Sequence, residues 1–402
     1  MPTTERLYYN DSHLIEFEAQ VTDKTERVSG WTAVTLDRTA FFPTGGGQPT
    51  DTGILGGARV LECIDTDENE VLHVIQGRVP EVGATVKGRV DWPRRLDHIQ
   101  QHTGQHILSQ AFVTLFDAPT KGFRVLEQSC EIDVELSNPA NDLIERAVEL
   151  ANNVIWEDRQ ITIKTVTPEE AAELPLRKEP ARDGELRVIE IEGFDLTPCG
   201  GTHANRTGEV GMIGVRGWER AKGLCRIEFL AGGRASRDYR RANKTARAVA
   251  GLFSSARDDA TKLAARMIDE NKELHRRLRV LEEVAAESEA AQLVENTGAG
   301  PDGMRVISRI FDNRDSESVK RLAMSLISYP SIIALLGSRE GNSARLVFAK
   351  STDASGDMNA LMKDACAIIE GRGGGKPDMA QGGGKNVDRL GEALAVAAKS
   401  FE

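Results

Sequence analysis

Four side chains of the types that bind zinc occur as two pairs with the same spacing. His102 and His106 lie four residues apart in a segment with strong helical periodicity, so both imidazoles share one face of that helix. Cys199 and His203 have the same separation, but the prolines and glycines around them indicate a loop. Two nitrogen ligands from a helix and a sulfur–nitrogen pair from a loop are a plausible tetrahedral set for zinc. We therefore predict one Zn²⁺ per chain, bound by these four residues.

Two further observations limit the chemistry of this site. The helix of a metalloprotease carries a glutamate directly after its first histidine, whereas His102 is followed by Thr103, so peptidase chemistry is disfavoured. His98 stands one turn before His102 and is expected beside the ligands rather than among them, because four ligands already complete a tetrahedron. The spacing leaves open whether the zinc keeps a position for water or is closed by protein ligands.

The composition indicates a globular protein of several units. The chain has 402 residues, which suggests roughly two to four units, and it contains no apolar run long enough to span a membrane. The N-terminus lacks a signal-peptide pattern and the five cysteines are scattered, so we expect a reducing, cytoplasmic location. The net charge of −11 disfavours a nucleic-acid partner unless the basic residues are locally clustered.

The pattern of elements predicts an α+β protein with four parts. Short β-branched runs in residues 1–92 favour a small β-barrel, and residues 93–233 read as an α+β domain that holds the zinc. Residues 234–297 form a charged helical segment, and residues 298–402 show a compact α/β pattern. We expect strands at residues 31–36, 59–64, 71–75, 85–90, 161–166, 186–191, 225–230, 305–310, 331–336 and 345–349. We expect helices from Pro93 past Phe112 and at residues 141–158, 316–327, 358–370 and 389–401, with a glycine-rich loop at 371–384.

The helical segment carries a coiled-coil pattern. Met267, Leu274 and Leu281 recur every seven residues, and a companion row follows the same period. That row consists of Ala264, Asn271, Leu278 and Ala285. The pattern favours a homodimer formed through this segment or through the C-terminal part. The alternative is one long helix that packs against its own domain.

Several motifs, taken in order, resemble one family. The segments His102–His106, Pro198–His203, Phe42–Gln48 and Arg226–Phe229 are similar to the editing domain of alanyl-tRNA synthetases. The glycine-rich segment that begins at Arg372 resembles the DHHA1 domain that ends those synthetases. Their order along the chain resembles the free-standing alanyl-tRNA editing proteins called AlaX, in their long form.

The resemblance implies a hydrolase that removes serine, or alternatively glycine, from mischarged tRNA(Ala). The chain begins almost directly with the barrel, without the class II aminoacylation domain of a synthetase, so we expect editing without aminoacylation. Thr44 and Gln48 would bind the serine hydroxyl or hold a water molecule in the same pocket as the zinc. Gly45, Gly46 and Gly47 would let the backbone approach the tRNA terminus closely. The alternative for this loop is a tight turn between strands.

Basic residues supply candidate contacts to tRNA. Arg177 and Lys178 precede the cysteine-bearing strand and would meet the acceptor end. Further candidates are Arg240 and Arg241, within a basic cluster at residues 234–247, and Arg372 and Lys376 near the C-terminus. Each of these groups would otherwise be solvated surface.

Three other functions stay open at this point. The zinc could be purely structural in an RNA-binding module, or the editing domain could be of the threonyl-tRNA synthetase type. A generic zinc amidase is disfavoured because the sequence lacks a carboxylate base beside the histidines.

Overall fold

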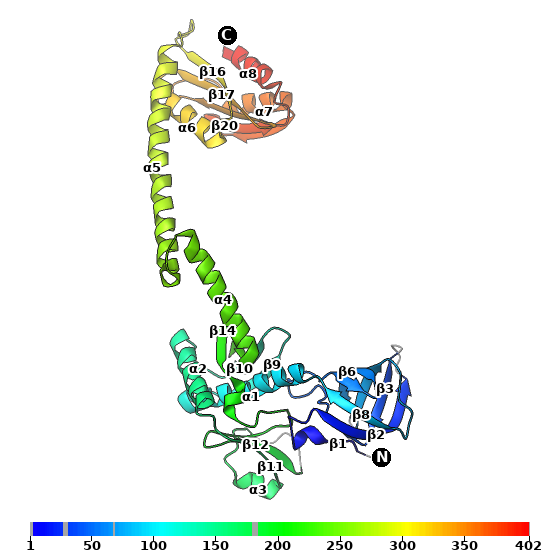
Figure 1. The fold of residues 1–402 in the computed structure, drawn as a ribbon. Helices are drawn as coiled ribbons and strands as arrows, with labels where there is room; N and C mark the ends of the chain where they lie inside the picture. The colour runs from blue at the N-terminus through cyan, green and yellow to red at the C-terminus, as the bar shows by residue number, and fades with distance from the viewer. Residues whose placement is uncertain (1–2, 27–30, 67–68, 179–183, 402) are drawn as a thin grey trace. The chain divides into compact units, whose positions relative to one another are not determined.

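A computed structural model describes residues 3–26, 31–66, 69–178 and 184–401 of the chain. The chain divides into two units, Met1–Val249 and Ala250–Glu402, and each is described by itself (Figure 1). The α+β class predicted from the sequence is confirmed, with a barrel, a helical segment and a C-terminal α/β part.

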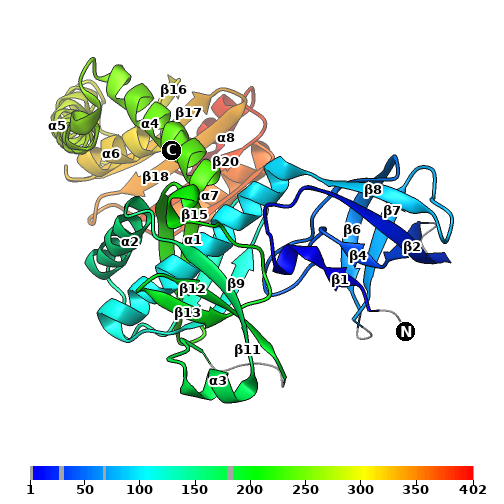
Figure 2. The ribbon, with the colours of Figure 1, turned by 60° about the horizontal axis from the view of Figure 1, so that its bottom comes forward.

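The first unit begins with a closed antiparallel barrel, seen as the blue strands in Figure 2. Its order is β2 (Glu16–Glu26), β3 (Thr32–Leu36), β7 (Val71–Gln76), β6 (Ala58–Asp65), β5 (Gly53–Leu55) and β8 (Thr85–Val90). Alternating side chains such as Phe17, Ala19 and Val21 fill the interior. A parallel pair, β1 (Glu5–Arg6) with β4 (Arg38–Thr39), and a short helix η1 (Leu7–Tyr9) lie before and beside it. The barrel was predicted correctly, although β2 and β5 were not foreseen.

Helix α1 (Trp92–Phe116) is the central element of the α+β part. Pro93 stands in its first turn, where the missing N–H costs nothing, and most residues from Arg95 to Phe112 are buried. The apolar side of α1 packs on α2 (Asn141–Trp156) and on a four-stranded sheet. That sheet has the order β14 (Ile213–Ala221), β15 (Leu224–Ala231), β10 (Cys130–Val134) and β9 (Thr120–Val125).

A second, three-stranded sheet carries the loop with the cysteine ligand. It consists of β11 (Ile161–Val166), β12 (Leu186–Ile191) and β13 (Asp195–Pro198), with α3 (Pro168–Glu173) between the first two. Thr167 and Glu170 form a capping box that starts α3. A short helix η2 (Thr207–Val210) follows the loop. Among the described strands of the whole α+β part, the sequence predicted β11, β12 and β15. The other strands of the two sheets were not predicted.

The segment predicted as helical at residues 234–297 consists of more than one helix. It comprises α4 (Gly232–Leu252), the short helix η3 (Arg257–Asp259) and α5 (Ala260–Glu295). The break follows from Ser254, whose φ of 51° ends α4, while the amide of Ser255 donates to the carbonyl of Ala250. The heptad positions all fall within α5, where Met267, Leu274 and Leu281 are exposed.

The second unit contains a five-stranded sheet between helices, as its α/β pattern predicted. The strand order is β16 (Arg305–Asp312), β17 (Ile332–Glu340), β18 (Ser343–Lys350), β20 (Met379–Gly384) and β19 (Gly371–Gly375). Helices α5 and α6 (Ser316–Leu326) pack on one face. Helices α7 (Met358–Ile368) and α8 (Leu390–Ala398) pack on the other, and η4 (Lys399–Phe401) ends the described chain.

The glycine-rich segment at 371–384 was predicted as a loop, and this was wrong. It forms the hairpin of β19 and β20. A Cβ at Gly373 would lie 2.7 Å from the sulfur of Cys366, and one at Gly382 would lie 2.8 Å from the sulfur of Met362. Glycine is therefore required here by the close approach of α7 and not by a turn. Among the described helices, none is both long and apolar enough to cross a membrane.

The barrel contains a fully buried histidine, His73. Because of this residue, we expect the protein to lose stability in acid. The His73 Nδ1–H donates to the Val34 carbonyl, and Nε2 lies 2.8 Å from the Thr39 hydroxyl, which donates to it. Burial lowers the pKa of His73 to about 4. Its neutral form therefore stabilises the fold fully above about pH 6.5, and this stability is lost as the pH falls towards about 4.

We expect His73→Gln to unfold with a weaker pH dependence than the wild type between these values. The wild type should lose up to about 3 kcal/mol more than the variant over this interval. Urea denaturation at a series of pH values measures the difference. Parallel pH profiles for the two proteins would contradict the assignment.

Candidate metal centre

The two predicted pairs of ligands lie together in the structure. Helix α1 carries His102 and His106, and the loop that follows β13 carries Cys199 and His203. One potential ligand atom from each of the four lies within 4.8 Å of the others. The sulfur of Cys199 is 3.3 Å from Nε2 of His102. Tetrahedral zinc with ordinary bond lengths places its ligand atoms about 3.3–3.6 Å apart, so this cluster has the right size.

Two hydrogen bonds turn the helix histidines towards the cluster. Nδ1 of His102 donates to Oε1 of Gln48 at 2.8 Å, and Nδ1 of His106 donates to Oδ2 of Asp195 at 3.2 Å. Each bond leaves Nε2 deprotonated and available as a ligand. Carboxylate and amide oxygens behind metal-bound histidines orient the rings in the same way in known metal sites.

His203 supplies the observation that best tests whether a metal fits. The residue is 1% exposed, and neither ring nitrogen has a hydrogen-bond partner within the described ranges. Its backbone is held, because its amide donates to the Ser12 hydroxyl at 3.0 Å. A buried imidazole without partners is costly unless it binds something. The donor set of three imidazoles and one thiol fits zinc.

The electrostatics of the cluster favour the metal-binding forms of Cys199 and His203, whereas, against the effect of burial, hydrogen bonds to Asp195 and Cys199 raise the pKa of His106. Burial alone would raise the pKa of Cys199, but the nearby His102 and His203 hold it well below its ordinary value. Burial lowers the pKa of His203 to about 3. These shifts favour the thiolate of Cys199 and the neutral imidazole of His203, which are the forms that bind a metal.

Asp195 was not foreseen from the sequence, and it joins the cluster to Arg177. The Nε of Arg177 donates to Oδ1 of Asp195 at 2.8 Å and to the Thr197 hydroxyl at 3.0 Å. Burial opposes ionisation of Asp195, but its bonds to His106 and Arg177 lower its pKa to about 2. Arg177, expected to meet the tRNA acceptor end, thus first holds the carboxylate that orients His106.

The side chain of Gln48 is buried, whereas a residue that binds substrate is expected to be open to the pocket. It is 1% exposed, and its Nε2 donates to the hydroxyl of Thr202 at 2.9 Å while Oε1 accepts from His102. The amide of Thr202 also donates to Oε1, at 3.3 Å. The Gln48 side chain thus joins the loop of Gly45, Gly46 and Gly47 to His102 and to Thr202. The sequence alone could not show that Thr202 lies within hydrogen-bond distance of Gln48.

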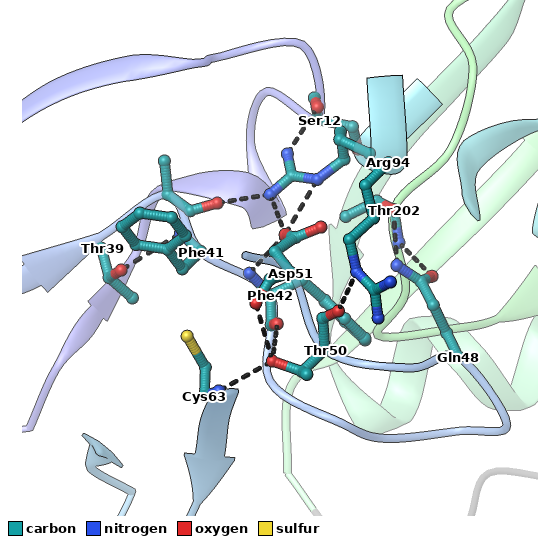
Figure 3. Close-up of polar contacts among 12 residues, drawn as sticks. Ser12, Thr39, Phe41, Phe42, Gln48, Thr50, Asp51, Cys63, Arg94 and Thr202 are labelled. Atoms are coloured by element: carbon teal, nitrogen blue, oxygen red, sulfur yellow. Dashed lines mark hydrogen bonds and ion pairs between the residues drawn. The ribbon is translucent and has the colours of Figure 1, made fainter. Parts of the chain in front are cut away.

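A buried ion pair fixes this loop to α1 (Figure 3). Asp51 and Arg95 are both fully buried, and Oδ2 of Asp51 accepts from Nε of Arg95 at 3.0 Å and from the Phe42 amide at 2.7 Å. The same guanidinium donates to the carbonyls of Ser12 at 2.7 Å and Ala40 at 2.5 Å. One side chain of α1 thus holds three segments of the barrel side.

His102, His106 and Cys199 line a pocket of about 710 Å³. Thr44, Gly45, Gly46 and Lys178 line the same pocket. The Thr44 hydroxyl has no hydrogen-bond partner among the residues that the structure describes. Gly47 instead packs on β9, where a Cβ would clash with the carbonyl of Phe123.

Two pocket residues were missed from the sequence because they come from distant segments. Arg187 donates from NH1 to the carbonyls of Cys199 at 2.6 Å and Gly201 at 3.0 Å, while its NH2 is buried without a partner within the described part of the chain. The ring of Tyr9 lies between two guanidiniums, with Arg187 at 5.2 Å and Arg6 at 5.6 Å from its centroid. Cationic and aromatic groups thus continue the pocket beyond the cluster.

The remaining candidates lie elsewhere. Arg240 and Arg241 are exposed on α4, and Arg372 and Lys376 are exposed at the β19–β20 hairpin of the second unit. His98 is not part of the ligand cluster and lines a different groove.

Comparisons with known proteins were made for the whole chain. The model of the threonyl and alanyl tRNA synthetase second additional domain matches residues 186–228, and the DHHA1 domain model matches residues 303–402. The alanyl-tRNA editing protein AlaX-L of Pyrococcus horikoshii is 33% identical, over 94% of this chain and 94% of that protein. The alanine–tRNA ligase of Methanobrevibacter smithii is 29% identical over 98% of this chain, which spans only 46% of the ligase.

One similar solved structure is the C-Ala domain of alanyl-tRNA synthetase from Aquifex aeolicus. It matches with a TM-score of 0.23 and 24% identity, over 25% of this chain and 90% of that domain.

Proposed function

This chain belongs to the family of the alanyl-tRNA editing protein AlaX-L, and from this premise we propose that it hydrolyses seryl-tRNA(Ala) at a zinc site. Editing of mischarged tRNA(Ala) is the activity that the family membership supports. The observation that carries the zinc proposal is the buried His203, which has two unpartnered nitrogens beside His102, His106 and Cys199. Gly-tRNA(Ala) is the second substrate in the proposal.

Editing is needed because a pocket sized for alanine cannot strongly reject a side chain that merely adds a hydroxyl. A second site that recognises this hydroxyl can restore the discrimination. Thr44 is the residue that we assign to this task, since it lines the pocket and its hydroxyl is free within the described ranges. A bound serine would offer one donor and would accept one hydrogen bond, which matches the capacity of Thr44.

The residues around the cluster have distinct tasks in this proposal. Zinc held by the four ligands would supply a Lewis acid beside the ester carbonyl. Gln48 and Asp195 keep the ring nitrogens of His102 and His106 turned towards the cluster. The fixed rings lower the cost of reorganisation during hydrolysis.

The pocket beyond the cluster suits the terminal adenosine of a tRNA. Tyr9 offers a ring for the base to contact, and Lys178 and Arg187 offer positive charge for the phosphate, whereas the charge of Arg6 is paired with Asp65. For the tRNA body we retain the exposed Arg240, Arg241, Arg372 and Lys376 as proposed contacts.

We also propose that α5 pairs with a second copy of the chain. Met267, Leu274 and Leu281 are 59%, 63% and 65% exposed at heptad spacing, which supports a two-stranded coiled coil. Because its substrate is a product of aminoacylation, we place the protein in the cytoplasm.

Deacylation of purified Ser-tRNA(Ala) and Ala-tRNA(Ala) tests the proposal. We expect rapid loss of serine, retention of alanine, and inhibition by a chelator. Cys199→Ala should lose the zinc and slow serine release by about a thousandfold or more, since a Lewis acid contributes several kcal/mol.

Cys225→Ala is the matched control, because this cysteine is buried in the same unit but lies outside the cluster. It should keep both zinc and activity. Inertness of the wild type towards both aminoacyl-tRNAs would defeat the editing proposal. A zinc-free Cys199→Ala with the wild-type rate would defeat the role of the metal.

A further inference from the structure

A second large cavity lies in the first unit, beside the catalytic pocket. It has a volume of about 890 Å³ and is bordered by the first turns of α1, the start of α4, and the residues that follow β9. We call it the α1–α4 groove. Its lining includes Pro49, Trp92, Arg94, His98, Leu126 and Arg237.

His98 is a buried polar group in this groove that the metal site does not use. It is 2% exposed, and its Nδ1 is buried without a hydrogen-bond partner among the described residues. Burial, and then the nearby charge of Arg94, lower its pKa to about 4. The neutral ring therefore has one donor and one acceptor to offer. A buried group in this state indicates that a ligand belongs there.

Two guanidinium groups in the groove have N–H donors without a hydrogen-bond partner among the described residues. Arg94 uses only its Nε, which donates to the carbonyl of Thr50 at 2.9 Å, and Arg237 has no partner within the described ranges (Figure 3). The neighbouring Arg234 differs, because Asp97 and the carbonyl of Leu126 take its donors. Two carboxylates also line the groove: Asp97, which is paired with Arg234, and Glu127. The positive charge of Arg94 and Arg237 is therefore opposed by Glu127.

The groove also has apolar lining residues. Trp92, Pro49 and Val125 contribute to it, and Leu126 is 41% exposed. Aromatic and apolar surface beside free guanidiniums is the combination that binds single-stranded nucleic acid, where bases stack and phosphates pair. A small inorganic anion would not contact the apolar residues favourably.

The groove and the catalytic pocket border the same two segments. In the segment between β4 and β5, Gly45 and Gly46 line the pocket and Pro49 lines the groove. On β9, Phe123 faces the pocket and Val125 faces the groove. His98 precedes the ligand His102 by one helical turn, a rise of about 6 Å along α1.

We propose that the α1–α4 groove binds the cytidylate that precedes the terminal adenosine of the tRNA. Arg94 and Arg237 contact its phosphate, and His98 hydrogen-bonds the edge of its base. This inference rests on the proposed function, since it takes the terminal adenosine to lie in the catalytic pocket.

Kinetics on two substrates test the groove. Arg237→Ala should raise KM for Ser-tRNA(Ala) about tenfold with little change in kcat. The same variant should hydrolyse 3′-O-seryl-adenosine, which lacks the preceding nucleotide, like the wild type. The slope of log KM against log salt concentration should fall by about one. Arg59→Ala is the control, because Arg59 is an exposed barrel residue without a partner in the described ranges.

An unchanged KM for Ser-tRNA(Ala) in Arg237→Ala would overturn the proposal, as would an equal loss on both substrates. Binding of the unacylated trinucleotide CpCpA, followed by tryptophan fluorescence, gives a readout that needs no catalysis. We expect Arg237→Ala and His98→Ala each to weaken this binding, and Arg59→Ala to leave it unchanged. If CpCpA binds in this way but Ser-tRNA(Ala) is not cleaved, the proposed function fails while the groove stands. If both groove variants bind CpCpA like the wild type, the groove assignment fails.

Discussion

Replacement of Gly201 by alanine should displace His102 and empty the metal site. A Cβ at this position would lie 2.5 Å from Nδ1 of His102 and closer still to Cε1, a contact that real structures do not tolerate. The ring would have to move, and its bond to Gln48 would be lost. Disturbing the orientation of a metal-bound histidine costs about 10–100-fold in affinity or activity, and we expect a loss at the upper end of this range. Zinc content by mass spectrometry and deacylation of Ser-tRNA(Ala) measure the effect.

Gly200→Ala provides a closely matched control. The two glycines are neighbours in the same loop, but a Cβ at Gly200 would meet only the hydroxyl of Tyr9, at 3.5 Å. This variant should keep its zinc and stay within about twofold of the wild-type rate. Equal behaviour of the two variants would show that the loop does not control His102 through this contact.

Removal of either partner of the buried ion pair should cause the largest loss of stability in the first unit. Asp51→Asn or Arg95→Met leaves one fully buried charge without its partner, which costs about 3–5 kcal/mol. Asp51 also accepts a hydrogen bond from the Phe42 amide. The loop between these two residues should therefore become more mobile, and deacylation should fall as well. The free energy of unfolding from urea titration measures the first effect.

Two comparisons make this second test specific. Glu18→Gln removes a pair with Lys87 on the barrel surface, where the side chains are 64% and 86% exposed, and should cost less than about 1 kcal/mol. The double variant Asp51→Asn/Arg95→Met should lose less than the sum of the single variants, because neither charge is then left alone. Strict additivity would show that the two residues stabilise the fold independently.

The clustering of the four candidate ligands could be predicted from the sequence because the spacing of each pair reflects local backbone geometry. Four residues on a helix correspond to one turn, so His102 and His106 had to share a face. The Cys199–His203 loop added donors of the right chemistry. Asp195 and Arg187 could not be assigned in this way, because only the folded sheet of β11, β12 and β13 brings them to the cluster.

Elsewhere the sequence was misleading because one residue type serves two purposes. Glycines at 371–384 suggested a loop, but Gly373 and Gly382 are strand residues that make room for α7. Gln48 carries a polar group that suits substrate binding, yet both ends of its amide are used inside the protein. In both cases the outcome depends on residues that are distant in the sequence, namely those of α7 and Thr202. A local sequence pattern does not contain these contacts.

The contacts of Arg95 have a consequence for how the first unit unfolds. Its guanidinium binds the segments at Ser12, Ala40 and Asp51, while its backbone belongs to the helix that presents His102. We therefore expect the barrel and the N-terminal turns of that helix to unfold together as one cooperative unit. A mutation deep in the barrel should then change the position of His102 without contacting it.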